Sequence, residues 1–84
     1  MEYDKDKVDE MALAIIYLNS FQDEYMKGEF ITRAWKDISW EVMNRLHEKG
    51  YISDPKGKTR SVVLTEEGEK LWKELFTRFF ARKE

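Results

Sequence analysis

The chain has 84 residues, 38% of them charged, and a formal net charge of -2 at pH 7. This length allows one domain with a small core, residues 1–84, and excludes a second. The absence of cysteine excludes a disulfide framework, a thiol nucleophile and cysteine-ligated zinc.

The longest apolar run, residues 11–18, is too short for a membrane-spanning helix, which needs about 20 residues. The acidic start MEYDKDKVDE also lacks the basic and then apolar pattern of an export signal. We therefore expect a soluble protein that enters no membrane. A cytoplasmic location agrees with the lack of cysteine.

The first predicted helix begins after Asp4 or Asp6, whose carboxylates can accept backbone N–H bonds, and runs to about Met26, with Gly28 just beyond. Apolar side chains recur on one face at spacings of three and four residues: Val8, Met11, Ala12, Ile15, Leu18 and Tyr25. So wide an apolar face predicts a helix that is central or shared with a partner subunit.

Two further helices are predicted before the next glycine. Thr32 is a candidate cap for a short helix over residues 33–37. Ser39 is a candidate cap for a longer helix, and Gly50 suits the position that follows its end. The first of these has room for little more than one turn.

The stretch YISDPKGKTRSVVLTEEG predicts a β-hairpin and then a helix. Its strands are residues 51–53 and 60–64, and Thr65 caps the helix. Apolar side chains recur along this last helix: Leu71, Trp72, Leu75, Phe76, Phe79 and Phe80. We expect them in the core or in a homodimer interface, in preference to a small-molecule pocket.

The segments RLHEKGYI and VVLTEEG resemble parts of winged helix-turn-helix domains of the MarR and PadR types, with Leu46, Gly50, Ile52, Leu64, Thr65 and Gly68 at the matching positions. The whole layout also resembles a small uncharacterised bacterial family, a domain of unknown function. The winged-helix resemblance implies a mostly α, α+β fold in the order helix, short helix, helix, β-hairpin wing, C-terminal helix. It also implies a homodimer built by the first and last helices.

The same resemblance implies a DNA reader, with residues 39–49 as the recognition helix and the hairpin as a wing. Asn and Arg side chains suit adenine and guanine edges in the major groove, and loop cations suit phosphates. The candidate contacts are Asn44, Arg45, Lys56, Lys58 and Arg60. Glu41 and Glu48 on the same helix would be repelled by DNA unless cations pair with them.

We therefore predict a DNA-binding protein, a small transcription regulator that binds double-stranded DNA. The alternative is a winged-helix module for protein–protein interaction that touches no nucleic acid, which the net acidity, the reduced second helix and the glutamates of the third favour. An enzyme is not expected, because His47 is the only imidazole and the carboxylates lie where capping and solubility explain them. The sequence predicts no catalytic residue, metal or cofactor.

Overall fold

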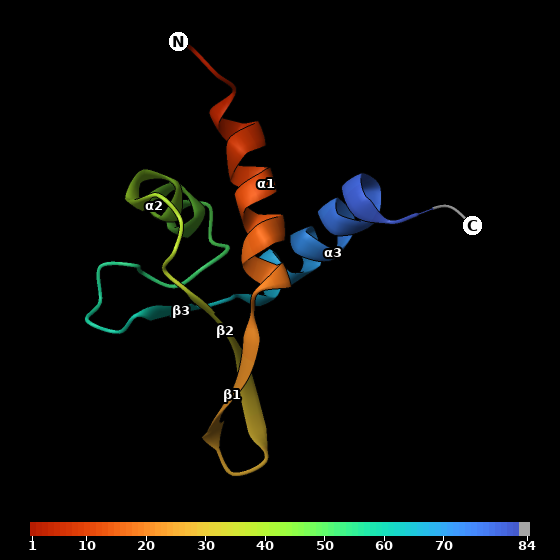
Figure 1. Cartoon of the computed structure of the whole chain (residues 1–84). Helices are drawn as coiled ribbons and strands as arrows, with labels where there is room; N and C mark the ends of the chain where they lie inside the picture. Colours follow the sequence, from red (N-terminus) through yellow and green to blue (C-terminus); the bar gives the residue numbers. More distant parts are fainter. Residues whose placement is uncertain (83–84) are drawn as a thin grey trace.

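The computed structural model describes residues 1–82, without the side chain of Tyr25. Within this range the chain forms three helices and one three-stranded antiparallel sheet (Figure 1). In chain order the elements are α1 (Lys5–Leu18), β1 (Phe21–Met26), β2 (Glu29–Trp35), α2 (Trp40–Glu48), β3 (Ser61–Val63) and α3 (Glu66–Phe80). The predicted mostly α, α+β class is confirmed.

Helix α1 is shorter than predicted. The expected end at Met26 is wrong, because the helix stops at Leu18. Just beyond it, Asn19 Nδ2 donates a hydrogen bond of 3.3 Å and Ser20 Oγ one of 2.7 Å to carbonyl oxygens of the last turns. These side-chain donors bind carbonyl oxygens that would otherwise accept backbone N–H bonds from further helical residues. The helix therefore ends here, and the chain continues as a strand.

Residues 21–35 form an antiparallel hairpin of β1 and β2, which we call the arm. The short helix predicted over residues 33–37 is therefore wrong. Met26 pairs with Glu29, and Gly28 in the turn between them has a φ of 80°, a conformation that glycine adopts without strain. The outer end of the arm projects away from the helices (Figure 1).

Strand β2 is the middle strand of the sheet, with β1 on one side and β3 on the other. Ala34 of β2 lies opposite Val62 of β3. The predicted pairing of residues 51–53 with 60–64 is reduced to one bridge, between Ile52 and Leu64. The winged-helix order is not confirmed, because β2 stands where that order requires the short supporting helix.

The predicted helix caps are better matched by the structure. Asp4 caps α1 and accepts a backbone hydrogen bond at 3.1 Å, and Thr65 caps α3 and accepts one from Gly68 at 3.0 Å. Ser39 precedes α2, although its side chain makes no capping bond. Gly50 follows α2 with a φ of 84°, as its position at a helix end requires.

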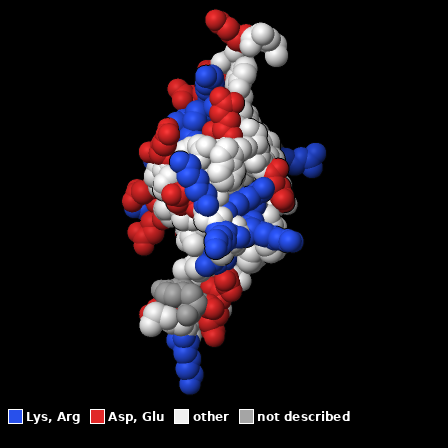
Figure 2. Space-filling view, turned by 90° about the vertical axis from the view of Figure 1, so that its left-hand side faces the viewer, with Lys and Arg blue, Asp and Glu red and all other residues white. Residues whose placement is uncertain are grey.

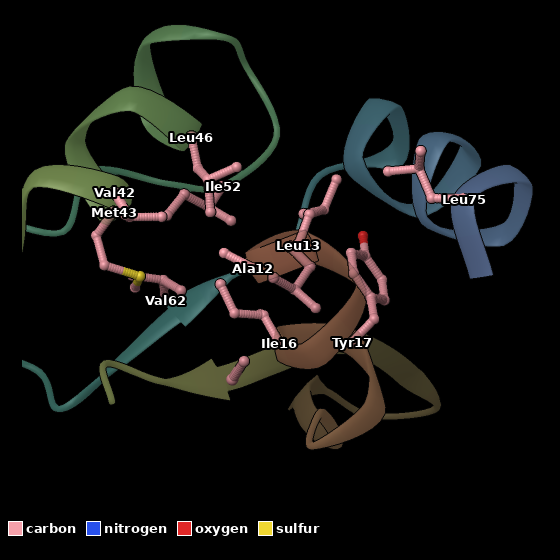
Figure 3. Packing of buried hydrophobic residues seen from close by; sticks show 12 residues of the cluster. Ala12, Leu13, Ile16, Tyr17, Val42, Met43, Leu46, Ile52, Val62 and Leu75 are labelled. Atoms are coloured by element: carbon pink, nitrogen blue, oxygen red, sulfur yellow. The ribbon is translucent and has the colours of Figure 1, made fainter. Parts of the chain in front are cut away.

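The core surrounds α1, which lies between α2 and α3 and also contacts β2 (Figures 1 and 3). Leu13, Met43 and Leu46 are fully buried in it. The remaining buried apolar members are Ala12, Ile16, Tyr17, Ala34, Val42, Ile52, Val62, Leu64 and Leu75. No helix within residues 1–82 combines the length and the apolar character needed to cross a bilayer.

Candidate functional site

A buried ion cluster fastens α2 to α1. Arg45 Nε donates to the two carboxylate oxygens of Asp9 at 3.0 and 2.9 Å, and Arg45 Nη2 adds a bond of 2.8 Å. Lys49 Nζ donates to Asp9 and to Asp6, at 2.9 Å each. Asp9 is only 1% exposed, so these cations take the place of water around its charge.

The electrostatics keep this cluster ionised. Burial acts to raise the pKa of Asp9, but the hydrogen bonds and charges of Arg45 and Lys49 outweigh it, and the pKa lies below the usual value. Hydrogen bonding to Asp9 raises the pKa of Arg45. Burial acts to lower the pKa of Lys49, and its bonds to Asp9 and Asp6 raise it overall. Asp9, Arg45 and Lys49 therefore carry their full charges at neutral pH.

The two residues predicted to read bases do not form an open reading surface. Arg45 is turned toward α1, and its Nη1 lies 3.6 Å from Glu41. Asn44 is half-buried, whereas Glu41, Glu48 and Trp40 are exposed on α2. The exposed face of α2 therefore carries two carboxylates and an indole, and the Arg45 side chain that was predicted to lie on it is bound to Asp9.

The three residues predicted to contact phosphates lie together on the loop of residues 54–60. Lys56, Lys58 and Arg60 are exposed, and within residues 1–82 none of them forms an ion pair. Figure 2 shows Lys and Arg side chains gathered near the middle of the face that carries α2 and this loop, with acidic side chains beside them and along the edge. The loop is therefore a free cationic surface.

An open hollow of about 580 Å³ lies between this loop and the end of β2. It is lined by Trp35, Lys36, Asp37, Thr59 and Arg60. The Lys36 backbone N–H donates to the Arg60 carbonyl at 3.0 Å, and Lys36 Nζ donates to the Gly57 carbonyl at 2.8 Å. These two bonds fasten the loop to the sheet and give the hollow a defined wall.

Sequence reasoning missed Trp35 and Lys36 as members of a site, because it placed them in a helix. The dipeptide itself was a usable signal, since an aromatic residue beside a cation is a common element of ligand surfaces. Their place beside Arg60 could not be read from the chain, because it depends on the pairing of β2 with β3.

A second candidate surface is apolar and lies on α1. Val8, Met11, Ile15 and Leu18, which we call the α1 stripe, are 36%, 39%, 41% and 59% exposed. Their spacing of three, four and three residues places them on one face of the helix. It is also the spacing of the paired apolar positions that meet a second helix in a coiled coil.

Aromatic rings on α3 extend this apolar surface. Trp72, Phe76 and Phe80 form a ladder, with ring centroids 5.4 and 5.1 Å apart in turn. Trp72 Nε1 donates to the Ala14 carbonyl at 3.2 Å, and its ring stacks on Tyr17 at 5.0 Å between centroids, so the first ring of the ladder packs against α1.

The described part of the chain contains no cluster of side chains suited to a metal ion. No group of three or more His, Asp or Glu side chains there is arranged to hold a metal ion. His47 Nδ1 lies 3.0 Å from the Ile52 carbonyl, a contact that ties the end of α2 to the following segment.

Comparison with known protein families shows which family the chain belongs to. Residues 4–82 match the model of a domain of unknown function, DUF6429. The chain belongs to this family. It is also 42% identical over 82 residues to the uncharacterized protein y4hR of Sinorhizobium fredii (strain NBRC 101917 / NGR234), which covers 98% of this chain and 100% of that protein. No solved structure matches the chain. The expected small uncharacterised family is thus confirmed, and the likeness to winged-helix regulators is not.

Proposed function

We propose that this domain is a protein-association module that acts as a homodimer through α1 and α3. The observation that carries the proposal is the α1 stripe, four apolar side chains with coiled-coil spacing that remain 36% to 59% exposed. The α3 ladder, whose Trp72 packs against α1, offers further apolar area. Contiguous apolar surface of this kind is typical of protein interfaces.

The total surface of the chain supports a subunit partner. Its accessible surface is 6407 Å². A folded monomer of 10.2 kDa is expected to expose about 5,300 Å², so the excess is about 1,100 Å². A standard interface buries about 800 Å² on each partner, which is within this excess. The radius of gyration of 13.3 Å is likewise above the about 12 Å expected of a compact domain of this length.

The electrostatics favour association over base reading by α2. Arg45 would have to leave Asp9 to reach a base edge, and this would leave a carboxylate that is 1% exposed without its main partner. Separating such a pair costs about 3–5 kcal/mol, more than the about 1–3 kcal/mol that one bidentate base contact contributes. The balance disfavours α2 as a recognition helix.

The experiment is a measurement of mass in solution for the protein and two variants. We expect the wild type to have twice the monomer mass, and the double variant Ile15→Glu, Leu18→Glu to be a monomer, because each carboxylate would be desolvated in the interface. Phe30→Glu is the matched control, since Phe30 is 57% exposed on the arm and outside the α1 stripe. We expect it to remain a dimer.

The outcomes separate the proposal from a folding defect. Circular dichroism should show the same helix content in all three proteins, because the substituted side chains are exposed. A wild type that stays monomeric at millimolar concentration would overturn the proposal, as would a double variant that keeps the wild-type mass.

Binding to double-stranded DNA is a second candidate function, favoured by the exposure of Lys56, Lys58 and Arg60 on one fastened loop. Cations on such a loop can neutralise phosphates and release counterions whatever the base sequence. The triple alanine variant should bind duplex more weakly and with a smaller dependence on salt. The absence of any duplex binding by the wild type at low salt would refute this candidate.

A further inference from the structure

The sheet has one face that the helices leave open. Ala34 of β2 is 1% exposed and points into the core, so its neighbours Arg33 and Trp35 point to the opposite face. Phe21 of β1 lies opposite Arg33 in the register, on that same open face. Arg33 Nε donates a hydrogen bond of 2.9 Å to Asp23, which lies two residues after Phe21 and therefore on the same face of the sheet.

An aromatic platform stands at one end of this open face. The rings of Phe21 and Trp35 have centroids 5.1 Å apart and an interplanar angle of 32°. Trp35 is still 50% exposed, so its indole retains a free surface after this contact. An exposed indole that is held in place by a second ring is suited to stack on a flat aromatic ligand.

Cations surround the platform on the side of the hollow. Lys36 and Arg60 line the hollow together with Trp35, and Lys58 is exposed on the same loop. The hydrogen bonds from Lys36 to the loop fix these charges relative to the indole. Asp37 also lines the hollow, and its carboxylate would repel a phosphate that lay beside it.

We propose that the Trp35 platform and the cations of the 54–60 loop form a binding site for single-stranded nucleic acid. An unpaired base stacks on the indole, and the adjoining phosphates lie along Arg60 and Lys58. Single strands are recognised by this combination of aromatic stacking and a basic track. In a duplex the base faces are already stacked on one another, so the indole has no face to contact.

The proposal goes beyond association through α1 and α3. The single-strand site and the duplex candidate both use the loop cations, and in this respect the proposal rests on the second candidate function. The indole distinguishes the two, because only the single-strand site uses Trp35. Ile15 of the α1 stripe and Trp35 line one small cavity, whereas Met11 and Leu18 of the stripe do not line it.

The test is the anisotropy of a labelled oligothymidylate and of a labelled duplex of equal length, each titrated with the protein at low salt. We expect the single strand to bind more tightly than the duplex. Trp35→Ala should weaken single-strand binding about tenfold, as loss of one base–aromatic stack does. Trp35→Phe should recover part of the affinity, because a phenyl ring retains a stacking face.

Trp40→Ala is the matched control, because Trp40 is 52% exposed and does not line the hollow. It should bind like the wild type. Lys58→Ala with Arg60→Ala should weaken binding and reduce its dependence on salt. A Met11→Glu, Leu18→Glu variant, substituted at stripe positions that do not line the cavities beside Trp35, should keep its affinity per site, so a failure of dimerisation would not be mistaken for a failure of this site.

Three results would overturn the proposal. They are equal or tighter binding of the duplex, an equal effect of Trp35→Ala and Trp40→Ala, and a change in solution mass caused by Trp35→Ala without a change in affinity. The last result would assign the platform to a protein partner.

Discussion

The substitution Asp9→Asn tests the ion cluster between α1 and α2. It keeps the size of the side chain but removes the charge that faces Arg45 and Lys49. Breaking a buried ion pair costs about 3–5 kcal/mol, and the side chains of Arg45 and Lys49 are 17% and 34% exposed, so water partly compensates them. We therefore expect the free energy of unfolding to fall by about 3 kcal/mol.

The assay is urea denaturation of wild type and variant at neutral pH, with an unchanged m-value as evidence that the unfolding transition is the same. Asp23→Asn is the control, because Asp23 pairs with Arg33 at 2.9 Å but is 50% exposed. An exposed pair of this kind contributes about 0–1 kcal/mol. A loss for Asp9→Asn no larger than that for Asp23→Asn would refute the reasoning.

The same pair of proteins gives a prediction for pH. The pKa of Asp9 is lower in the folded protein than its ordinary value of 3.8, so its contribution to stability is complete above pH 3.8. That contribution is lost as the pH falls further, through the folded pKa. The difference in stability between wild type and Asp9→Asn should therefore be constant from pH 7 to pH 5 and should shrink below about pH 4.

Three more substitutions, one of them a control, test the packing. A Cβ at Gly68 would meet the Tyr51 carbonyl oxygen at less than contact distance, so Gly68→Ala should destabilise by about 1–3 kcal/mol. Gly57→Ala, with its nearest such atom 4.0 Å away, should change stability little by comparison in the same thermal unfolding assay. Leu75→Ala should cost about 2–5 kcal/mol in urea denaturation, because Leu75 is 1% exposed, and a loss under 1 kcal/mol would contradict its place in the core.

Local chemistry explains what the sequence predicted correctly about the fold. The caps at Asp4 and Thr65 and the helix end at Gly50 each depend on one residue and its near neighbours. A side-chain oxygen three residues before a free backbone N–H, or a glycine with positive φ, is visible in the chain itself. Such signals therefore located α3 and the end of α2 within a residue or two.

The arm and the ion cluster depend on contacts that the chain does not display locally. The spacing of Phe21 and Tyr25 fits a helix as well as it fits a strand, and only the pairing across Gly28 decides between them. Arg45 was predicted to contact DNA, because its partner Asp9 lies 36 positions away in the sequence and no local signal indicates the pair. The structure leaves the predicted loop cations exposed, whereas it binds Arg45 of the predicted recognition helix to Asp9.

The arm has a practical consequence for work with this protein. Its tip, at Lys27 and Gly28, is exposed, and neither residue belongs to the buried core. Exposed loop tips of this kind tolerate insertions better than any segment whose backbone is buried. A short peptide tag or a single cysteine for labelling at Lys27 should therefore leave the helices unchanged, and a dye placed there would report on any partner that approaches the open face of the sheet.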